Sequence, residues 1–113
     1  MDLKGVLTEA AEDDLALWEL ATEARSELPN GTLEEVRNRV LDFVGPLLSG
    51  HLLVAGQLSA DPPGKFVPWE LTPDEALARV EGFMRNIHRE PRLGDNFYFV
   101  ATALGRRWAG FLA

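Results

Sequence analysis

The feature that most constrains the fold of this chain is a pair of helix-start signals, at residues 32–35 and 72–75. In each, a threonine oxygen can accept a hydrogen bond from the amide of the glutamate three residues later, whose carboxylate can accept one from the threonine amide. Pro73 strengthens the second signal, because proline is favoured at the first helical position. Two helices must begin after Thr32 and Thr72, and the strand-like segments between and after them predict an α+β fold.

An earlier helix is predicted over residues 9–28, where apolar residues recur at three- and four-residue spacing. Asp13 and Asp14 near its start suit the positive end of a helix dipole. The Pro-Asn-Gly sequence at residues 29–31 then ends this helix with a turn.

The helix that follows Thr32 extends to about residue 49, but Gly45 and Pro46 interrupt its apolar stripe. Proline has no amide hydrogen, so Pro46 cannot bond to the carbonyl of Asp42. We therefore expect a kink here, or a division into two short helices.

An apolar run at residues 51–58 predicts a strand. The loop at residues 59–65, which contains Asp-Pro-Pro-Gly, joins it to a second strand at residues 66–70 in a hairpin. Pro68 confines that second strand to an edge of the sheet, because proline cannot donate to a neighbouring strand.

The helix that follows Thr72 ends before Pro91, and the aromatic segment at residues 96–102 predicts another strand, which pairs with the hairpin. Thr102 can cap a last helix at residues 103–112. The large apolar residues of that helix are expected to face the core; they are Leu104, Trp108 and Phe111. Residues 1–113 should thus form one domain, of about four helices packed on a two- to three-stranded antiparallel sheet.

The composition fits one domain with its own core, since the 113 residues are 46% hydrophobic. The sequence has no cysteine, which excludes disulfides, thiolate metal sites and thiol nucleophiles. No uninterrupted apolar stretch approaches the length of about 18 residues that a membrane-spanning helix needs. Residues 1–12 lack the pattern of a signal peptide. A cytoplasmic protein without membrane contact is expected. Nine of its 11 basic residues are arginine, a bias associated with GC-rich bacterial coding.

The net charge of −7 belongs to the first half of the chain. Residues 1–50 contain 11 acidic and 4 basic residues, whereas residues 51–113 contain 7 of each. The acidic first helix could mimic the charge of a nucleic acid or meet a basic partner, because a surface of one sign steers association.

The order of the predicted elements resembles the winged-helix layout. Two helices, the second leading through Leu-Leu-Ser-Gly-His-Leu-Leu-Val at residues 47–54, precede the hairpin. Residues 97–108 look like the strand and Thr-x-x-Gly turn that open the last helix of many small bacterial winged-helix-like proteins. The chain departs from that layout in having one clear helix before the presumed recognition helix, and in inserting residues 72–90 between strands. The resemblance implies a winged-helix-like fold, and function has to be argued from the site.

The sequence predicts no catalytic residue, metal ligand or cofactor. His51 and His88 are 37 positions apart and lack metal-ligand spacing. The serines lack a nucleophile-elbow frame, and no phosphate-binding glycine loop is present. The paired acids lie in the first turns of helices, where the helix dipole already explains them. An enzyme is therefore not expected.

Nucleic-acid binding requires basic side chains aimed at phosphates. The presumed recognition helix, residues 33–49, carries two arginines against three acidic residues, which disfavours that role. A second basic surface is formed by Arg85, His88, Arg89 and Arg92, and would include Arg106 and Arg107 if the last helix lies nearby.

The aromatic residues of the second half supply candidates for an interface. Trp69 lies next to Pro68 on the predicted edge strand, and Tyr98 is on the face of its strand opposite Phe97 and Phe99. The sequence thus predicts a non-enzymatic protein-interaction module that binds another protein or a second copy of itself. Its candidate surface residues are Trp69, Tyr98, Arg85, Arg89, Arg106 and Arg107. The alternatives are a DNA-binding regulator, and a ligand-binding domain or enzyme with a pocket between the third helix and the sheet.

Overall fold

Both helix-start signals are formed in the computed structural model, which describes residues 1–112. Thr32 Oγ1 accepts a hydrogen bond from the Glu35 amide at 3.1 Å, and the Glu35 carboxylate accepts one from the Thr32 amide at 3.0 Å. The same two bonds join Thr72 and Glu75 at 3.2 and 2.9 Å. The predicted starts of these two helices are confirmed.

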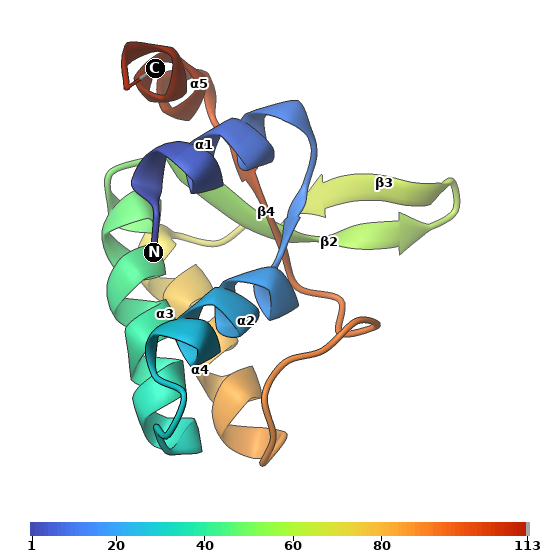
Figure 1. Cartoon of the computed structure of the whole chain (residues 1–113). Coiled ribbons are helices and arrows are strands. Elements are labelled where there is room, and N and C mark those ends of the chain that lie inside the picture. Colours follow the sequence, from blue (N-terminus) through green and yellow to red (C-terminus); the bar gives the residue numbers. More distant parts are fainter. Residues whose placement is uncertain (113) are drawn as a thin grey trace.

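Over residues 1–112 the chain forms five helices and four strands, in a mixed α+β arrangement (Figure 1). Their bounds in chain order are α1 Leu3–Glu12, β1 Leu15–Ala16, α2 Leu17–Glu27, α3 Leu33–Ser49, β2 Leu53–Ala60, β3 Pro63–Pro68, α4 Pro73–Asn86, β4 Tyr98–Ala101 and α5 Ala103–Phe111. The predicted hairpin, the strand after α4 and the last helix are therefore confirmed. The loop predicted at residues 59–65 is shorter, because β2 continues to Ala60 and β3 already begins at Pro63.

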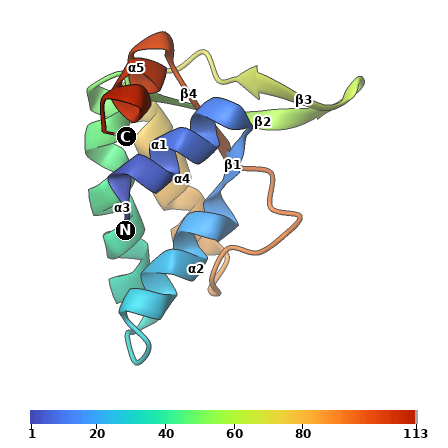
Figure 2. The same ribbon diagram turned by 45° about the horizontal axis from the view of Figure 1, so that its top comes forward.

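The strands form one antiparallel sheet in the order β1-β4-β2-β3. β4 lies between β1 and β2, so that Phe99 is opposite Leu15 on one side and Ala55 on the other. The β2–β3 hairpin extends away from the helices (Figures 1 and 2). As predicted, the second strand of the hairpin is an edge strand. The sheet has one strand more than the largest number expected.

The core lies where the helices meet the sheet. Four of its fully buried side chains come from four different elements: Leu20 of α2, Val40 of α3, Val80 of α4 and Phe99 of β4. α3 packs against both α2 and α4, and α1 packs against β4 and α5. No helix in the described part of the chain is long and apolar enough to cross a membrane.

The single helix predicted over residues 9–28 is wrong, because two helices with a short strand between them occupy this region. Asp13 is extended and ends α1, and its carboxylate accepts from the Asp14 amide at 2.8 Å. Leu15 and Ala16 then pair with β4 and are buried, while Glu19 caps α2 by accepting from the Ala16 amide at 2.8 Å. Sheet pairing and a local cap thus override the helical periodicity, which is why there is one helix more than expected.

α3 is not divided at Pro46, contrary to one of the two expectations. Asp42 and Pro46 are both exposed, so water can replace the single hydrogen bond that proline removes. The next turn resumes at once, because the Gly50 amide donates to the Pro46 carbonyl at 2.9 Å. A Cβ on Gly45 would lie 3.3 Å from Leu77, so this turn also packs closely against α4.

Candidate interaction surface

The start of α5 is fixed to the sheet by Thr102. Its hydroxyl accepts from the Gly105 amide at 3.0 Å, which is the cap that the sequence predicts. The same hydroxyl donates to the His51 carbonyl at 2.5 Å, and the Thr102 amide donates to the Leu52 carbonyl at 3.1 Å. These bonds join α5 to the segment that leads into β2, so they determine which side of the helix faces inward.

The inward side of α5 carries small residues. Gly105 and Ala109, which are four positions apart, are the buried residues of this helix. A Cβ on Gly105 would lie 2.1 Å from the Leu52 carbonyl oxygen and 3.3 Å from the Ala101 side chain. The helix can approach the sheet this closely because position 105 has no side chain.

The prediction that Leu104, Trp108 and Phe111 face the core is therefore wrong. These side chains are 38, 46 and 93% exposed. The apolar stripe exists as predicted, but the contact through Gly105 turns it toward solvent. With Arg107 and Leu112 the stripe lines an open hollow of about 630 Å³. We call these five residues, Leu104, Arg107, Trp108, Phe111 and Leu112, the α5 patch.

The two arginines of α5 have different places on the helix. Arg107 is three positions after Leu104 and four before Phe111, so it lies within the patch. Arg106 is exposed but is about 100° round the helix from its neighbour and does not line the hollow. α5 contains no acidic residue, and neither arginine forms an ion pair within residues 1–112. The patch is thus apolar with one positive charge.

Trp69 makes several contacts within the protein and is only partly exposed. Its ring packs edge-on against Phe97 at 5.4 Å between centroids, and the Arg79 guanidinium lies 4.4 Å from its centre. Its indole Nε1 donates to the Gln57 side chain at 3.3 Å. Phe97 in turn stacks on Phe83 of α4 at 4.1 Å. Trp69 therefore joins the hairpin to α4.

Tyr98 lies beside an acidic cluster between α1, β1 and α2. Burial raises the pKa of Tyr98, and the carboxylates of Asp14 and Glu19 raise it further. Burial likewise raises the pKa of Glu9 and of Asp14, with Glu19 adding to both. No group of three His, Asp or Glu side chains in residues 1–112 is placed to hold a metal ion.

Arg85 and Arg89 lie at or just beyond the C-terminal end of α4, and both are paired with acids. Arg85 bonds to Glu81 one turn earlier at 2.9 Å. Arg89 forms two bonds to the Asp95 carboxylate at 2.9 and 3.0 Å and one to the Glu90 carbonyl at 3.0 Å. The hydrogen bonds from Arg89 hold the pKa of Asp95 below its usual range. These contacts stabilise the loop between α4 and β4.

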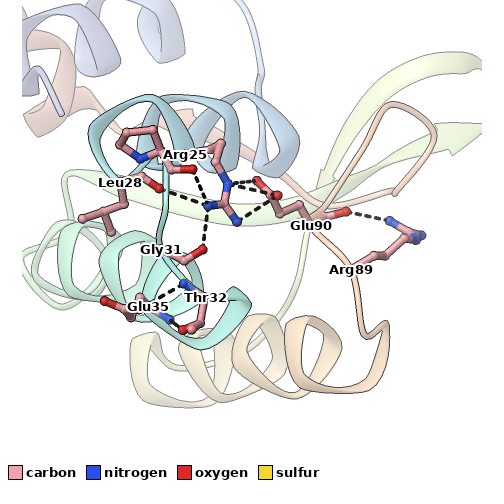
Figure 3. Close-up of polar contacts among 8 residues, drawn as sticks. Arg25, Leu28, Gly31, Thr32, Glu35, Arg89 and Glu90 are labelled. Atoms are coloured by element: carbon pink, nitrogen blue, oxygen red, sulfur yellow. Dashed lines mark hydrogen bonds and ion pairs between the residues drawn. The ribbon is translucent and has the colours of Figure 1, made fainter.

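Arg25 of α2 is the centre of a network that the sequence did not indicate (Figure 3). Its guanidinium bonds to both carboxylate oxygens of Glu90 at 3.2 Å and to the carbonyls of Leu28 at 3.0 Å and Gly31 at 2.6 Å. It thus ties the α2–α3 turn to the chain that follows α4. Arg25 and Glu90 are 65 positions apart, so no local sequence pattern could reveal their pairing.

The structure does not bring the six predicted surface residues together. Arg106 and Arg107 are on α5, whereas Arg85 and Arg89 are near the C-terminal end of α4, at the opposite end of the molecule (Figures 1 and 2). Because α5 does not lie near the C-terminal end of α4, the basic side chains of the two helices do not form one continuous surface.

A second hollow, of about 230 Å³, lies between β2 and the start of α4, where the sequence placed a possible ligand pocket. Its polar lining comes from His51 and Thr102, and the Thr102 hydroxyl is already bonded to the main chain. Ligand sites usually enclose about 300–1,000 Å³. The volume of this hollow lies below that range.

Of these two hollows, the one lined by the α5 patch is the larger, and its lining suits binding to an apolar surface. Its lining consists of aromatic and aliphatic side chains and a single cation, Arg107. Compared with models of protein families, with curated proteins and with solved structures, the chain matches none.

Proposed function

We propose that this protein is a non-enzymatic interaction module that binds another protein through the α5 patch. The observation that carries the proposal is the inverted packing of α5, in which Gly105 is buried while Phe111 is 93% exposed. Burying a large apolar side chain stabilises a protein by about 1.5–3 kcal/mol. A fold that leaves such residues in water, grouped around a hollow, has apolar surface available for a partner.

The composition of the patch supports binding to protein. Tryptophan and arginine are among the residues that most often dominate binding energy at protein interfaces. Trp108 and Arg107 are adjacent here, and Leu104 and Leu112 surround them with apolar surface.

A winged-helix-like layout, with α2, α3 and the β2–β3 hairpin, is part of this proposal as a scaffold and not as a DNA-binding unit. Arg39 of α3 bonds to Glu27 at 2.8 Å through Nε, and Arg37 lies 3.9 Å from Glu34. The carboxylates beside these arginines offset positive charge that phosphate binding requires.

The test is affinity capture with three baits: the unchanged chain, Phe111→Ser and Leu93→Ser. Leu93 is the matched control, because it is 77% exposed and lies in the loop before β4, away from α5. Proteins retained by the unchanged chain and by Leu93→Ser should be lost with Phe111→Ser. If all three baits retain the same proteins, the patch is not the interface.

DNA binding is measured on the same samples by fluorescence anisotropy of a random duplex at about 50 and about 200 mM salt, a range over which phosphate-driven binding falls steeply. The proposal predicts no binding at either salt. Binding that collapses at the higher salt would support the regulator instead.

A further inference from the structure

We propose that the partner of the α5 patch presents an acidic amphipathic helix, whose apolar side chains enter the hollow and whose carboxylate pairs with Arg107. This inference rests on the proposed function and specifies the chemistry of the partner. It follows from the shape of the patch, from its charge and from the area that it offers.

The shape suits one face of a helix. The hollow of about 630 Å³ is lined along two turns of α5, from Leu104 to Leu112. An amphipathic helix that binds in an apolar groove inserts side chains spaced by three, four and seven residues. Leu104, Trp108 and Phe111 have that same spacing, so the two helices can interdigitate.

The charge requires a carboxylate on the partner. Arg107 lies in the middle of the apolar surface, and no acidic side chain of α5 is available to it. A partner that covers the patch removes water from this guanidinium, and burying a charge without a partner is strongly unfavourable. A carboxylate at the edge of an apolar helical face would satisfy it with charge-assisted hydrogen bonds.

A second copy of this chain does not meet that requirement. A two-fold pairing of α5 with itself about Trp108 would place the two Arg107 side chains next to each other, with no acid on either helix. The aromatic area is also small. With about 200 Å² for a fully exposed aromatic side chain, Phe111 and Trp108 expose roughly 280 Å², against about 800 Å² per partner in stable interfaces. A short helical segment fits this area better than a dimer.

An anionic membrane surface fits less well for two reasons. The net charge of −7 repels such a surface, and α5 has 9 residues, which give only two and a half turns of amphipathic helix.

The experiment uses two fluorescein-labelled helical peptides of about 18 residues, with the same leucines spaced three, four and seven residues apart. One carries glutamates beside the leucines and the other carries lysines at those positions. Each is titrated by anisotropy with the full chain and with Arg107→Glu, Arg106→Glu and Phe111→Ser. Arg106→Glu is the matched control, because it makes the same charge change outside the patch. Melting temperatures verify that all variants are folded.

The acidic peptide should bind the unchanged chain and Arg106→Glu with similar affinity, and Arg107→Glu at least about tenfold more weakly. Arg107→Glu should also reverse the preference, so that it binds the lysine peptide more tightly. Phe111→Ser should weaken the binding of both peptides.

Three results would overturn the inference while leaving the interface itself in place. The first is equal binding of the two peptides, and the second is an unchanged peptide preference in Arg107→Glu. The third is that the acidic peptide does not bind at about 1 mM although Phe111→Ser still abolishes protein capture. If neither the peptides nor the capture respond to Phe111→Ser, the proposed function fails as well. A dimer in sedimentation velocity that Phe111→Ser dissociates would assign the patch to a second copy. Sedimentation with phosphatidylglycerol vesicles that Phe111→Ser abolishes would assign it to a membrane.

Discussion

α4 and α5 are both amphipathic helices that begin at a threonine cap, yet they pack in opposite senses. α4 buries Ala76, Val80 and Met84 and presents its charged residues to water. α5 buries Gly105 and Ala109 and presents its large apolar residues to water. An apolar stripe therefore shows where a helix can make an apolar contact, but not whether that contact is with the core. The side of the helix that can approach the neighbouring backbone most closely determines which side faces inward.

The largest expected difference is in the free energy of unfolding when an aspartate is placed on the apolar stripe of α4 or on that of α5. Val80→Asp puts a carboxylate at a position that is 0% exposed and should cost about 4 kcal/mol or more. Phe111→Asp places it in solvent and should change the free energy of unfolding by less than about 0.5 kcal/mol. Urea denaturation measures both. Comparable losses would mean that the α5 stripe is buried after all.

The next effect concerns the two glycines of α5. Gly105→Ala should lose about 2 kcal/mol of stability, because the new Cβ would be forced against the Leu52 carbonyl. Gly110→Ala meets no atom within 4 Å and should gain about 0.5–1 kcal/mol from better helix propensity. Thermal unfolding compares the two. A stabilising Gly105→Ala would show that α5 does not approach the sheet closely.

The caps of the two helices should differ by a smaller amount. Thr72→Ala removes one capping interaction and should cost about 1 kcal/mol. Thr102→Ala removes a cap and also the bond to the His51 carbonyl, so about 2 kcal/mol is expected. Denaturant midpoints for both variants are compared with Thr22→Ala, an exposed threonine within α2, as the control. Equal costs would indicate that Thr102 does not hold α5 in its orientation.

The smallest effect is a pH dependence that belongs to the α4 side alone. The folded-state pKa of Asp95 is lowered by Arg89, so this carboxylate contributes stability above its unfolded pKa and loses it as the pH falls through the folded value. The stability difference between the unchanged chain and Asp95→Asn should therefore shrink from about pH 5 downward. The difference between the unchanged chain and Phe111→Ser should stay constant over the same range, because residues 103–112 contain no acid or histidine. A constant difference for Asp95→Asn would show that the Arg89 pair does not stabilise the fold.

The sequence predicted the elements whose ends carry local signals. The capping boxes, Pro73 and the cap at Thr102 each involve residues within a few positions of one another, and all are formed. β1 was missed because two residues make no alternating pattern, and Leu15 and Ala16 become a strand only by pairing with β4. The link between Arg25 and Glu90 was missed for the same reason, since it depends on distant chain segments.

The surface was predicted only in part. Arg107 was identified and lies in the α5 patch, but Leu104, Trp108 and Phe111 were assigned to the core. The periodicity identified the residues of the apolar stripe but not whether the stripe faces the core or solvent. The available signal was the spacing of Gly105 and Ala109, two small residues one turn apart, which marks the side where a helix can pack most closely.

The most direct test of the account is the rate at which a thiol at position 111 reacts with Ellman's reagent. The chain has no cysteine, so Phe111→Cys introduces a single reactive group, and Val80→Cys provides the buried reference. The account predicts that the thiol at position 111 reacts at nearly the rate of a free cysteine, while the one at position 80 reacts only through unfolding. Equal protection of the two thiols would contradict the outward orientation of α5, and with it the proposed interface.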